Sequence, residues 1–354
     1  MRRKSTVLFA LAALAVSPAS ADDKTLAKLP ALAANISETS VSGISSGAYM
    51  AGQFQIAHSK IVAGAAIIAG GPYGCAESAF ADLMLGPGVA FLNLSKAING
   101  CMLNALALWG IPNVDMLVEK TQKLAEQGRI DPLSDLQSDR VYLFSGSNDH
   151  TVVPAIVKAA YEFYQRIGIA ESNLTFVSSL PAGHAFVTEG EGAACENTDT
   201  PYVVDCDYDQ AGEVLKRIYG PLAARVASPA GTFLEFDQRP FFEGFSNHGM
   251  GGRGVAYIPA PCAGSTTCRV HIAYHGCAQN RSMAGDAFIR ESGYANWADG
   301  NGFIVLFPEA AVSPVNPQGC WDWWGYTSKD YLTRDAPQIE IVHRMLKALE
   351  KPRP

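Results

Sequence analysis

Charged residues are scarce in this 354-residue sequence, and those present give it a net negative charge. Asp, Glu, Lys and Arg together make up 17% of the chain, and the formal charge at pH 7 is −7. Because no basic stripe is present, a nucleic-acid partner is not expected. With 48% hydrophobic residues the chain is also too apolar to be disordered, so its composition is that of a globular protein. Its charge balance is compatible with a neutral or uncharged substrate.

Long apolar runs are missing from residue 22 onwards, where no segment offers the 18 or so uninterrupted apolar residues of a transmembrane helix. We therefore expect no integral membrane association. The N-terminus is different: a basic start at Arg2 to Lys4 precedes an apolar run from Thr6 to Val16, and small residues lead to Ala21. This pattern is typical of a secretory signal peptide over residues 1–21, with an uncleaved anchor as the alternative. It predicts a secreted protein, extracellular or periplasmic.

Internal repeats, low-complexity tracts and Pro/Ser-rich linkers are absent as well, which favours one catalytic domain over residues 22–354. Eight cysteines lie in this part, and an even number in an exported chain favours disulfides over free thiols. A zinc site is the rival, but no C-x-x-C pair or His cluster supports it. Eight cysteines allow 105 connectivities. Sequence proximity suggests the pairs Cys195–Cys206 and Cys262–Cys268, which leaves Cys75–Cys101 and Cys277–Cys320.

Short apolar runs alternate with helix-like segments along the chain. Such alternation is typical of an α/β fold with a mostly parallel sheet and helices on both faces. The expected strands include 61–69, 141–144, 173–179, 253–259 (as an edge strand), 269–274 and 303–307. The expected helices include 48–59, 156–166, 288–299 and 335–351, whereas 185–243 is less regular.

A nucleophile-elbow pattern, G-x-S-x-G, occupies Gly43 to Gly47 between a strand-like and a helix-like run. In such an elbow the central residue, here Ser45, sits on a strained turn between strand and helix, at a helix N-terminus that favours negative charge. A Ser hydroxyl needs a base, usually a His oriented by a carboxylate. Asp149 and His184 follow strand-like runs in the chain order Ser, Asp, His, and they are the predicted acid and base. The alternatives are an ordinary turn, a turn-capping carboxylate and a solvated loop His.

Acyl transfer also requires backbone N–H groups aimed at the developing oxyanion. Ser46, the residue after the nucleophile, supplies one of them. The second usually comes from a His-Gly loop upstream of the elbow, but the only good candidate here, His275 to Ala278, lies 230 residues downstream. A circularly permuted α/β-hydrolase fold explains this order, because permutation moves the early strands to the C-terminal end. Helix 335–351 is then the one that leads into the elbow strand.

Four motifs in this order resemble the extracellular polyhydroxybutyrate depolymerases, of the single-domain type with an N-terminal lipase box. They are Gly43 to Tyr49, Ser145 to Val152, Pro181 to His184 and Tyr274 to Gln279. The resemblance covers nearly the whole mature chain. It implies Ser45, Asp149 and His184 as catalytic residues and the amides of Ser46 and Cys277 as the oxyanion hole.

An aromatic cluster follows the strand 303–307, and on this topology it borders the active-site edge of the sheet. Its residues could bind a hydrophobic polyester, or they could form a buried core pinned by Cys320. They are Trp321, Trp323, Trp324 and Tyr326. A Cys277–Cys320 bridge would attach this loop to the oxyanion loop.

The sequence therefore predicts a serine esterase that hydrolyses poly(3-hydroxybutyrate), or a related short-chain polyhydroxyalkanoate, through an acyl-enzyme. We expect it to be a monomer that needs no metal and no cofactor. Many members of the family carry an additional polymer-binding domain, which helps them adsorb to crystalline polymer, whereas this sequence resembles the single-domain members. Amorphous granules, oligomers or a related ester are therefore also expected as substrates. Two other functions stay open: a feruloyl or acetylxylan esterase, and a non-catalytic polymer- or granule-binding protein.

Overall fold

The structure is a computed structural model that describes residues 26–78 and 87–354. The predicted signal peptide, residues 1–21, lies outside the described residues. Within them, every helix is too short or too polar to cross a lipid bilayer.

Strands of both halves of the chain form one mixed sheet. Within the described residues it contains eight strands in the order β4-β3-β2-β1-β10-β11-β9-β8. From β4 to β11 the pairing is parallel, while β9 and β8 are antiparallel additions. The bounds are β1 (Asn35–Ile44), β2 (Val62–Ile68), β3 (Arg140–Phe144), β4 (Leu174–Val177), β8 (Thr232–Asp237), β9 (Arg253–Ile258), β10 (Arg269–Tyr274) and β11 (Phe303–Phe307). A separate small sheet pairs β5 (Phe186–Thr188), β7 (Val203–Asp205) and β6 (Ala193–Ala194).

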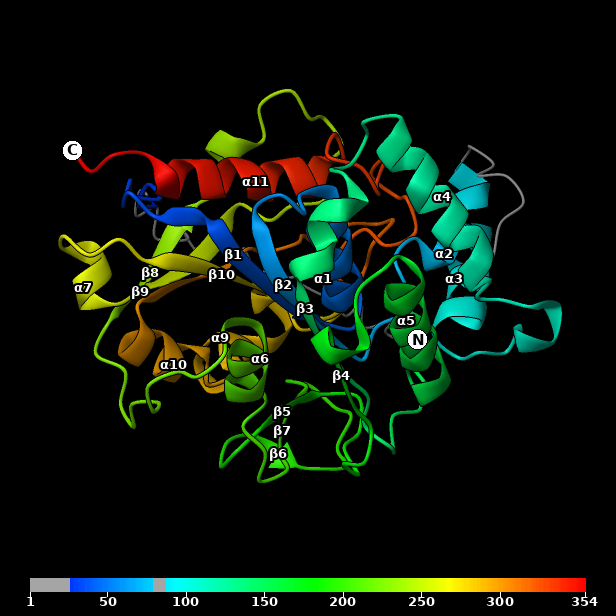
Figure 1. The fold of residues 1–354 in the computed structure, drawn as a ribbon, viewed down its shortest axis with the longest axis horizontal. Coiled ribbons are helices and arrows are strands. Elements are labelled where there is room, and N and C mark those ends of the chain that lie inside the picture. The colour runs from blue at the N-terminus through cyan, green and yellow to red at the C-terminus, as the bar shows by residue number, and fades with distance from the viewer. Residues whose placement is uncertain (1–25, 79–86) are drawn as a thin grey trace, which may run out of the picture.

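Helices cover both faces of the main sheet. In Figure 1, α11 and α1 lie on one side of it, and α6, α9 and α10 lie on the other. The α-helices are α1 (Ser46–Ala57), α2 (Cys75–Ser78), α3 (Pro87–Cys101), α4 (Val114–Glu126), α5 (Pro154–Arg166), α6 (Gln210–Tyr219), α7 (Ala260–Ala263), α8 (Arg281–Ala284), α9 (Ala287–Glu291), α10 (Tyr294–Asn301) and α11 (Pro337–Glu350). The 3₁₀ helices are η1 (Ala107–Trp109), η2 (Leu133–Ser138), η3 (Glu171–Asn173) and η4 (Arg239–Phe241). This arrangement confirms the predicted α/β class.

At the centre of the sheet, a strand from the start of the described chain pairs with a strand from its last third. Strand β1 pairs in parallel with β2 on one side and with β10 on the other, and Gly43 lies opposite Tyr274. The carboxyl ends of parallel strands meet at one edge of a sheet, so the residues after β1 and after β10 become neighbours. Ser45 and His275, which are 230 positions apart in the sequence, are thereby brought together by a single strand pairing.

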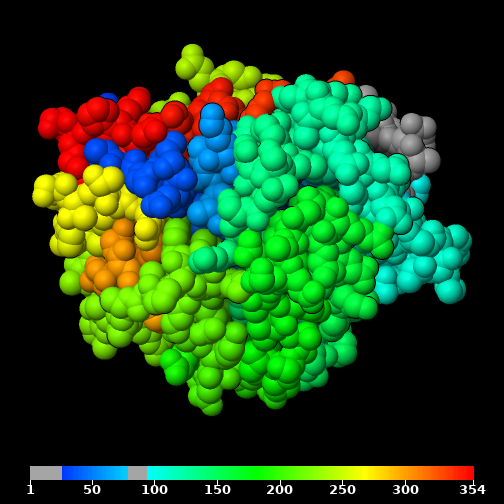
Figure 2. All heavy atoms as spheres, in the orientation of Figure 1, coloured from blue at the N-terminus to red at the C-terminus, as the bar shows by residue number. Residues whose placement is uncertain are grey.

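Helix α11 has the position that the predicted permutation requires. Its apolar residues Ile339, Val342, Met345, Leu346 and Leu349 are fully buried. The Leu349 carbonyl at its end accepts hydrogen bonds of 3.0 Å from the amides of Leu32 and Ala34, just before β1. In Figure 2 this C-terminal segment (red) and the start of the described chain (blue) lie side by side. The last helix thus leads, in space, into the elbow strand.

The expectation for the far edge of the sheet was wrong in one respect. Residues 253–259 were predicted as an edge strand, but β9 lies inside the sheet because β8 pairs outside it. Strand β8 belongs to the stretch 185–243 that reads as irregular in sequence. Its side chains are mostly half-buried, as on the outermost strand of a sheet, so the contrast between a buried and an exposed face is weak.

Candidate active site

Ser45 occupies a strained turn between β1 and α1. Its φ is 58° and its ψ is −122°, in a region that non-glycine residues rarely adopt. The two flanking glycines allow the turn to pack tightly. A Cβ on Gly43 would lie 2.1 Å from the Gly47 carbonyl oxygen, and a Cβ on Gly47 would lie 2.4 Å from the carbonyl oxygens of Tyr274 and His275. The G-x-S-x-G spacing therefore serves two close approaches, one within the elbow and one to the end of β10.

Asp149 and His184 form a buried pair after β3 and β4. The Asp149 Oδ2 atom lies 2.7 Å from His184 Nδ1, and both side chains are less than a tenth exposed. Asp149 Oδ1 accepts the backbone N–H groups of Thr151 at 2.8 Å and Val152 at 2.9 Å. Because both Asp149 oxygens are held, the carboxylate fixes the His184 ring with its Nδ1–H toward Asp149. This leaves Nε2 as the ring's acceptor.

Ser45 and His184 line the same cavity, which has a volume of about 400 Å³. Cys277 also lines it, as do Thr151 and Thr198 beside the His184 loop. The Thr198 hydroxyl accepts the His184 backbone N–H at 3.2 Å, which anchors that loop. The fold thus brings the predicted nucleophile, base and oxyanion loop to one cavity, with Asp149 behind the His184 ring.

The predicted oxyanion loop, residues 275–278, touches the elbow directly. A Cβ on Gly276 would lie 3.4 Å from the Ser45 Cβ. The Gly276 N–H donates to the Gln279 side chain at 2.8 Å, and the Ala278 N–H donates to the Gln318 carbonyl at 2.7 Å. Since the amides on both sides of Cys277 are engaged within the protein, the Cys277 N–H is the donor that this loop can offer to a ligand. The other predicted donor, Ser46, is the first residue of α1, where helix N–H groups lack intrahelical acceptors.

His275 holds this loop as a neutral ring. Its Nδ1 lies 2.7 Å from the Gly276 carbonyl oxygen, and its Nε2 accepts the Ala310 N–H at 3.2 Å. A carbonyl can only accept, so the proton is on Nδ1. Burial lowers the pKa of His275 to about 4, which keeps the ring uncharged at neutral pH.

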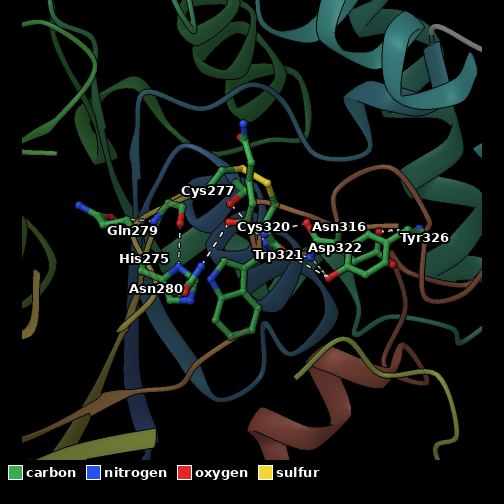
Figure 3. The surroundings of a disulfide bond; sticks show 12 residues. His275, Cys277, Gln279, Asn280, Asn316, Cys320, Trp321, Asp322 and Tyr326 are labelled. Atoms are coloured by element: carbon green, nitrogen blue, oxygen red, sulfur yellow. Dashed lines mark hydrogen bonds between the residues drawn. A yellow bond between two sulfur atoms is a disulfide. The ribbon is translucent and has the colours of Figure 1, made fainter. Parts of the chain in front are cut away.

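All eight cysteines are paired, in the predicted pattern: Cys75–Cys101, Cys195–Cys206, Cys262–Cys268 and Cys277–Cys320. Such a chain folds in an oxidising environment. Figure 3 shows the Cys277–Cys320 bridge between the oxyanion loop and the aromatic loop. The two loops come from the ends of different strands, β10 and β11, so this bridge is their direct covalent tie.

The aromatic loop contributes only part of what the sequence suggested. Trp323 and Trp324 line the cavity, and Trp323 stacks on Tyr49 of α1 with ring centroids 4.9 Å apart. Trp321 and Tyr326 do not line it. Trp321 is fully buried, and its backbone N–H donates to the Ser46 hydroxyl at 3.3 Å. The Tyr326 hydroxyl is engaged with Asn316, Cys320 and Gln338. These two residues support the site from behind rather than face a ligand.

Several cavity residues were missed at the sequence level. The apolar ones on α3 and just after it share a spacing of four residues, which could have indicated one helix face but not what that face covers. Tyr202 lies in the stretch 185–243, where no sequence pattern indicates a cavity residue. The residues concerned are Leu94, Ile98, Met102, Tyr202 and Val315.

A Ser–His contact occurs inside the sheet, away from the cavity. His271 of β10 lies 2.7 Å from the Ser40 hydroxyl and 2.8 Å from the Ser42 hydroxyl, and Tyr294 of α10 donates to Ser42. All of these side chains are fully buried, and none of them lines the cavity. Burial lowers the pKa of His271 to about 3. This cluster joins neighbouring strands and has no access to a substrate.

Removing the Cys277–Cys320 bridge should damage the oxyanion hole. In the double variant Cys277→Ser/Cys320→Ser the amide at 277 remains, but its loop is no longer tied to the aromatic loop. We expect kcat on a soluble ester to fall by about 10²-fold, the lower end of the cost of losing an oxyanion donor. Steady-state kinetics on p-nitrophenyl butyrate measures this.

The matched control is Cys262→Ser/Cys268→Ser. That bridge closes a short loop before β10, at the sheet edge opposite to the cavity. It should cost stability but leave kcat unchanged. Equal kcat values in the two double variants would contradict the assignment of the Cys277 amide.

The free energy of unfolding should be greatest near pH 6. Burial lowers the pKa of His58 and His271 from 6.5 to about 3 and that of His275 to about 4, and it raises the pKa of Asp139 from 3.8 and of Glu309 from 4.5 to about 8. From about pH 4.5 to 6 the unfolded chain binds up to three histidine protons that the folded chain does not bind, while the folded chain keeps two carboxyl protons that the unfolded chain has lost. Stability therefore rises with pH by a net one-proton slope. Above pH 6.5 only the carboxyl effect remains, so stability falls until about pH 8.

Thermal unfolding followed from pH 4.5 to 8.5 measures this maximum. The variant Glu309→Gln should halve the slope above pH 6.5, because one of its two sources is gone. A stability that rises steadily from pH 6.5 to 8 would contradict the expected sign.

Comparisons with known proteins found relatives of this chain, although no family model matches it. A poly(3-hydroxybutyrate) depolymerase of Delftia acidovorans is 38% identical over 323 residues, which cover 90% of this chain but 60% of that protein. A polyhydroxybutyrate depolymerase of Talaromyces funiculosus is 34% identical over 317 residues, covering 84% of this chain and 85% of the relative.

Two solved structures have the same fold. The PHB depolymerase of Penicillium funiculosum superposes with a TM-score of 0.81 at 30% identity, covering 92% of this chain and 100% of that one. A PHB depolymerase variant complexed with an R3HB trimer has a TM-score of 0.81 at 31% identity, covering 92% and 99%.

Proposed function

The chain belongs to the polyhydroxybutyrate depolymerase family, and on that premise we propose that it is a secreted serine esterase that hydrolyses poly(3-hydroxybutyrate) or its oligomers. The observation that supports this most directly is the cavity shared by Ser45, His184 and Cys277, with Asp149 bonded to the far side of the His184 ring.

The proposed reaction runs through an acyl-enzyme. His184 Nε2 takes the proton of the Ser45 hydroxyl as its oxygen attacks the ester carbonyl carbon. The amides of Ser46 and Cys277 bind the resulting oxyanion. As the intermediate collapses, the C–O bond to the alcohol breaks and His184 gives that alcohol its proton. Water, deprotonated by His184, then attacks the acyl group, and Ser45 leaves with its proton restored.

The lining of the cavity fits a polyester. Most of it is apolar or aromatic, and none of the residues that face it is a Lys, an Arg or a carboxylate in the described part of the chain. A chain of short hydroxyalkanoate units is neutral, so it meets no uncompensated charge there. The same machinery would serve a feruloyl or acetylxylan esterase, which is the second candidate.

The deciding experiment measures the clearing of a poly(3-hydroxybutyrate) suspension beside the release of ferulate and acetate from model esters. Clearing with weak activity on the model esters supports the proposal. Release from the model esters without clearing favours the second candidate. A non-catalytic binding protein would neither clear the suspension nor react at Ser45 with a fluorophosphonate probe.

Action on a solid should depend on the exposed apolar segment that follows the cavity residue Met102 in the chain. Met102 lines the cavity, and η1 follows shortly after it with Leu108 95% and Trp109 72% exposed. Figure 2 shows this segment standing out from the body of the molecule. Side chains this apolar and this exposed indicate contact with a hydrophobic surface.

Replacing both side chains, Leu108→Ser/Trp109→Ser, should slow suspension clearing by about tenfold or more, because the burial of two large side chains at the polymer surface is lost. Hydrolysis of soluble p-nitrophenyl butyrate by the same variant should be unchanged and serves as the control. Equal losses on both substrates would show that the segment shapes the cavity instead of binding the solid.

A further inference from the structure

Gln279 is a buried amide that connects two walls of the cavity. It lies two residues after Cys277, is 2% exposed, and appears in Figure 3 beside His275. Its Oε1 accepts the Gly276 N–H at 2.8 Å. Its Nε2 donates to the Tyr202 carbonyl at 3.0 Å and to the Pro201 carbonyl at 3.3 Å. One donor on one side and two carbonyls on the other leave a single orientation of the amide.

At the wall that carries the predicted oxyanion hole, Gln279 is one of two side chains that hold the polar groups of Gly276. The Gly276 N–H is held by Gln279 and its carbonyl by the His275 Nδ1–H. The peptide between Gly276 and Cys277 is planar and trans, so its N–H points opposite to its carbonyl. Holding both polar groups of Gly276 therefore sets the direction of the Cys277 N–H. A glycine has no side chain to restrict it, so its conformation depends on these two bonds together with the 3.3 Å bond from the Gln279 backbone N–H to the same carbonyl.

On the other side, Gln279 fixes the segment that carries Tyr202. This residue lines the cavity and has a φ of 58°, in the left-handed region. Its carbonyl accepts a second hydrogen bond of 2.8 Å from the Phe186 N–H at the start of β5. Tyr202 thus depends on Gln279 and on one strand of the small sheet.

We propose that Gln279 is a positioning residue that holds the oxyanion loop and the Tyr202 wall in a fixed relation, and so affects both the rate of ester hydrolysis and the binding of substrate. This inference rests on the proposed function. The oxyanion forms only in the transition state, so misplacing the Cys277 amide lowers kcat. Misplacing Tyr202 changes contacts that the bound substrate already makes, and so raises KM.

The variant Gln279→Met keeps the length of the side chain but removes both the acceptor and the donor. We expect kcat on p-nitrophenyl butyrate to fall about 10- to 100-fold, somewhat less than for the loss of an oxyanion donor itself. We expect KM to rise about fivefold, as for the loss of about one hydrogen bond. Affinity for an alkyl boronic acid, which forms a tetrahedral adduct with the Ser nucleophile, should weaken as much as kcat/KM.

Gln55→Met is the matched control. Gln55 is equally buried and bonds Asp139 and Tyr164 at 2.8 and 2.9 Å, at the opposite end of α1 from Ser45. Its loss should lower the melting temperature without changing kcat, KM or boronate affinity. If Gln279→Met behaves in the same way, Gln279 is only structural and the proposal is overturned.

Gln279→Glu is the second variant, for use if Gln279→Met does not fold. It retains an acceptor for the Gly276 N–H but loses the amide donor to Tyr202. Its KM should rise while kcat stays closer to that of the unsubstituted protein, and a fall in kcat with an unchanged KM would overturn the proposal. An unsubstituted protein that hydrolyses no ester would instead defeat the proposed function, so the two failures are distinguishable.

Discussion

Replacing Ser45 by Ala should lower the rate of poly(3-hydroxybutyrate) hydrolysis by at least about 10³-fold, because the loss of a triad nucleophile removes the covalent route altogether. What remains is the catalysis that the oxyanion hole and the cavity provide to attacking water. The measurement is the clearing rate of a polymer suspension, with p-nitrophenyl butyrate as the soluble substrate. The fold should be retained, since the hydroxyl makes none of the packing contacts that the glycines of the elbow make.

Ser42→Ala is the matched control for that variant. Ser42 is three residues away and bonds to a His, His271, but it is fully buried in the sheet. Its replacement should cost about 1 kcal/mol or more of stability through the unpaired partners it leaves. The catalytic rate per folded molecule should not change. A larger loss of rate with Ser42→Ala than with Ser45→Ala would indicate that Ser42, and not Ser45, is the nucleophile, and would contradict the proposal.

Asp149→Asn should lower kcat by about 10⁴-fold, as for the same change in other triads. The structure supplies the reason for such a large effect. The backbone amides of Thr151 and Val152 donate to one carboxylate oxygen, so the Asn oxygen takes that position. Its NH₂ group then faces His184 Nδ1, which must accept, and the proton moves to Nε2. A ring with Nε2–H has no acceptor for the Ser45 proton.

KM should change little in Asp149→Asn, because Asp149 lies behind His184 and does not line the cavity.

Asp139→Asn is the control that tests whether the replacement of any buried acid lowers kcat. Asp139 is also almost fully buried, and its pKa is raised to about 8 by burial, so its neutral form is already present at neutral pH. The Asn variant should therefore be fully active. A kcat loss below tenfold in Asp149→Asn would remove Asp149 from its proposed role.

The parallel part of the fold could be predicted because each of its strands has the apolar sequence that is typical of a buried strand. The run from 61 to 69 has no polar side chain and is followed by two glycines and a proline, and residues 62–68 of it form β2 with both faces covered. The half-exposed edge strand β8 has no comparable pattern. Pairing with β9, and not its own sequence, makes it a strand.

Local sequence determined the elements of this protein and the residue types that can carry ester hydrolysis. A G-x-S-x-G turn and a His and an Asp after strands express steric and chemical requirements that act over a few residues, and eight cysteines in an exported chain indicate disulfides. Tertiary structure decided which aromatic side chains reach the cavity: Trp323 faces it, whereas Trp321, two residues earlier, is buried beneath the elbow. It also decided the roles of Tyr202 and Gln279, because a buried amide acquires its function from partners that only the folded chain brings within 3 Å or so of it.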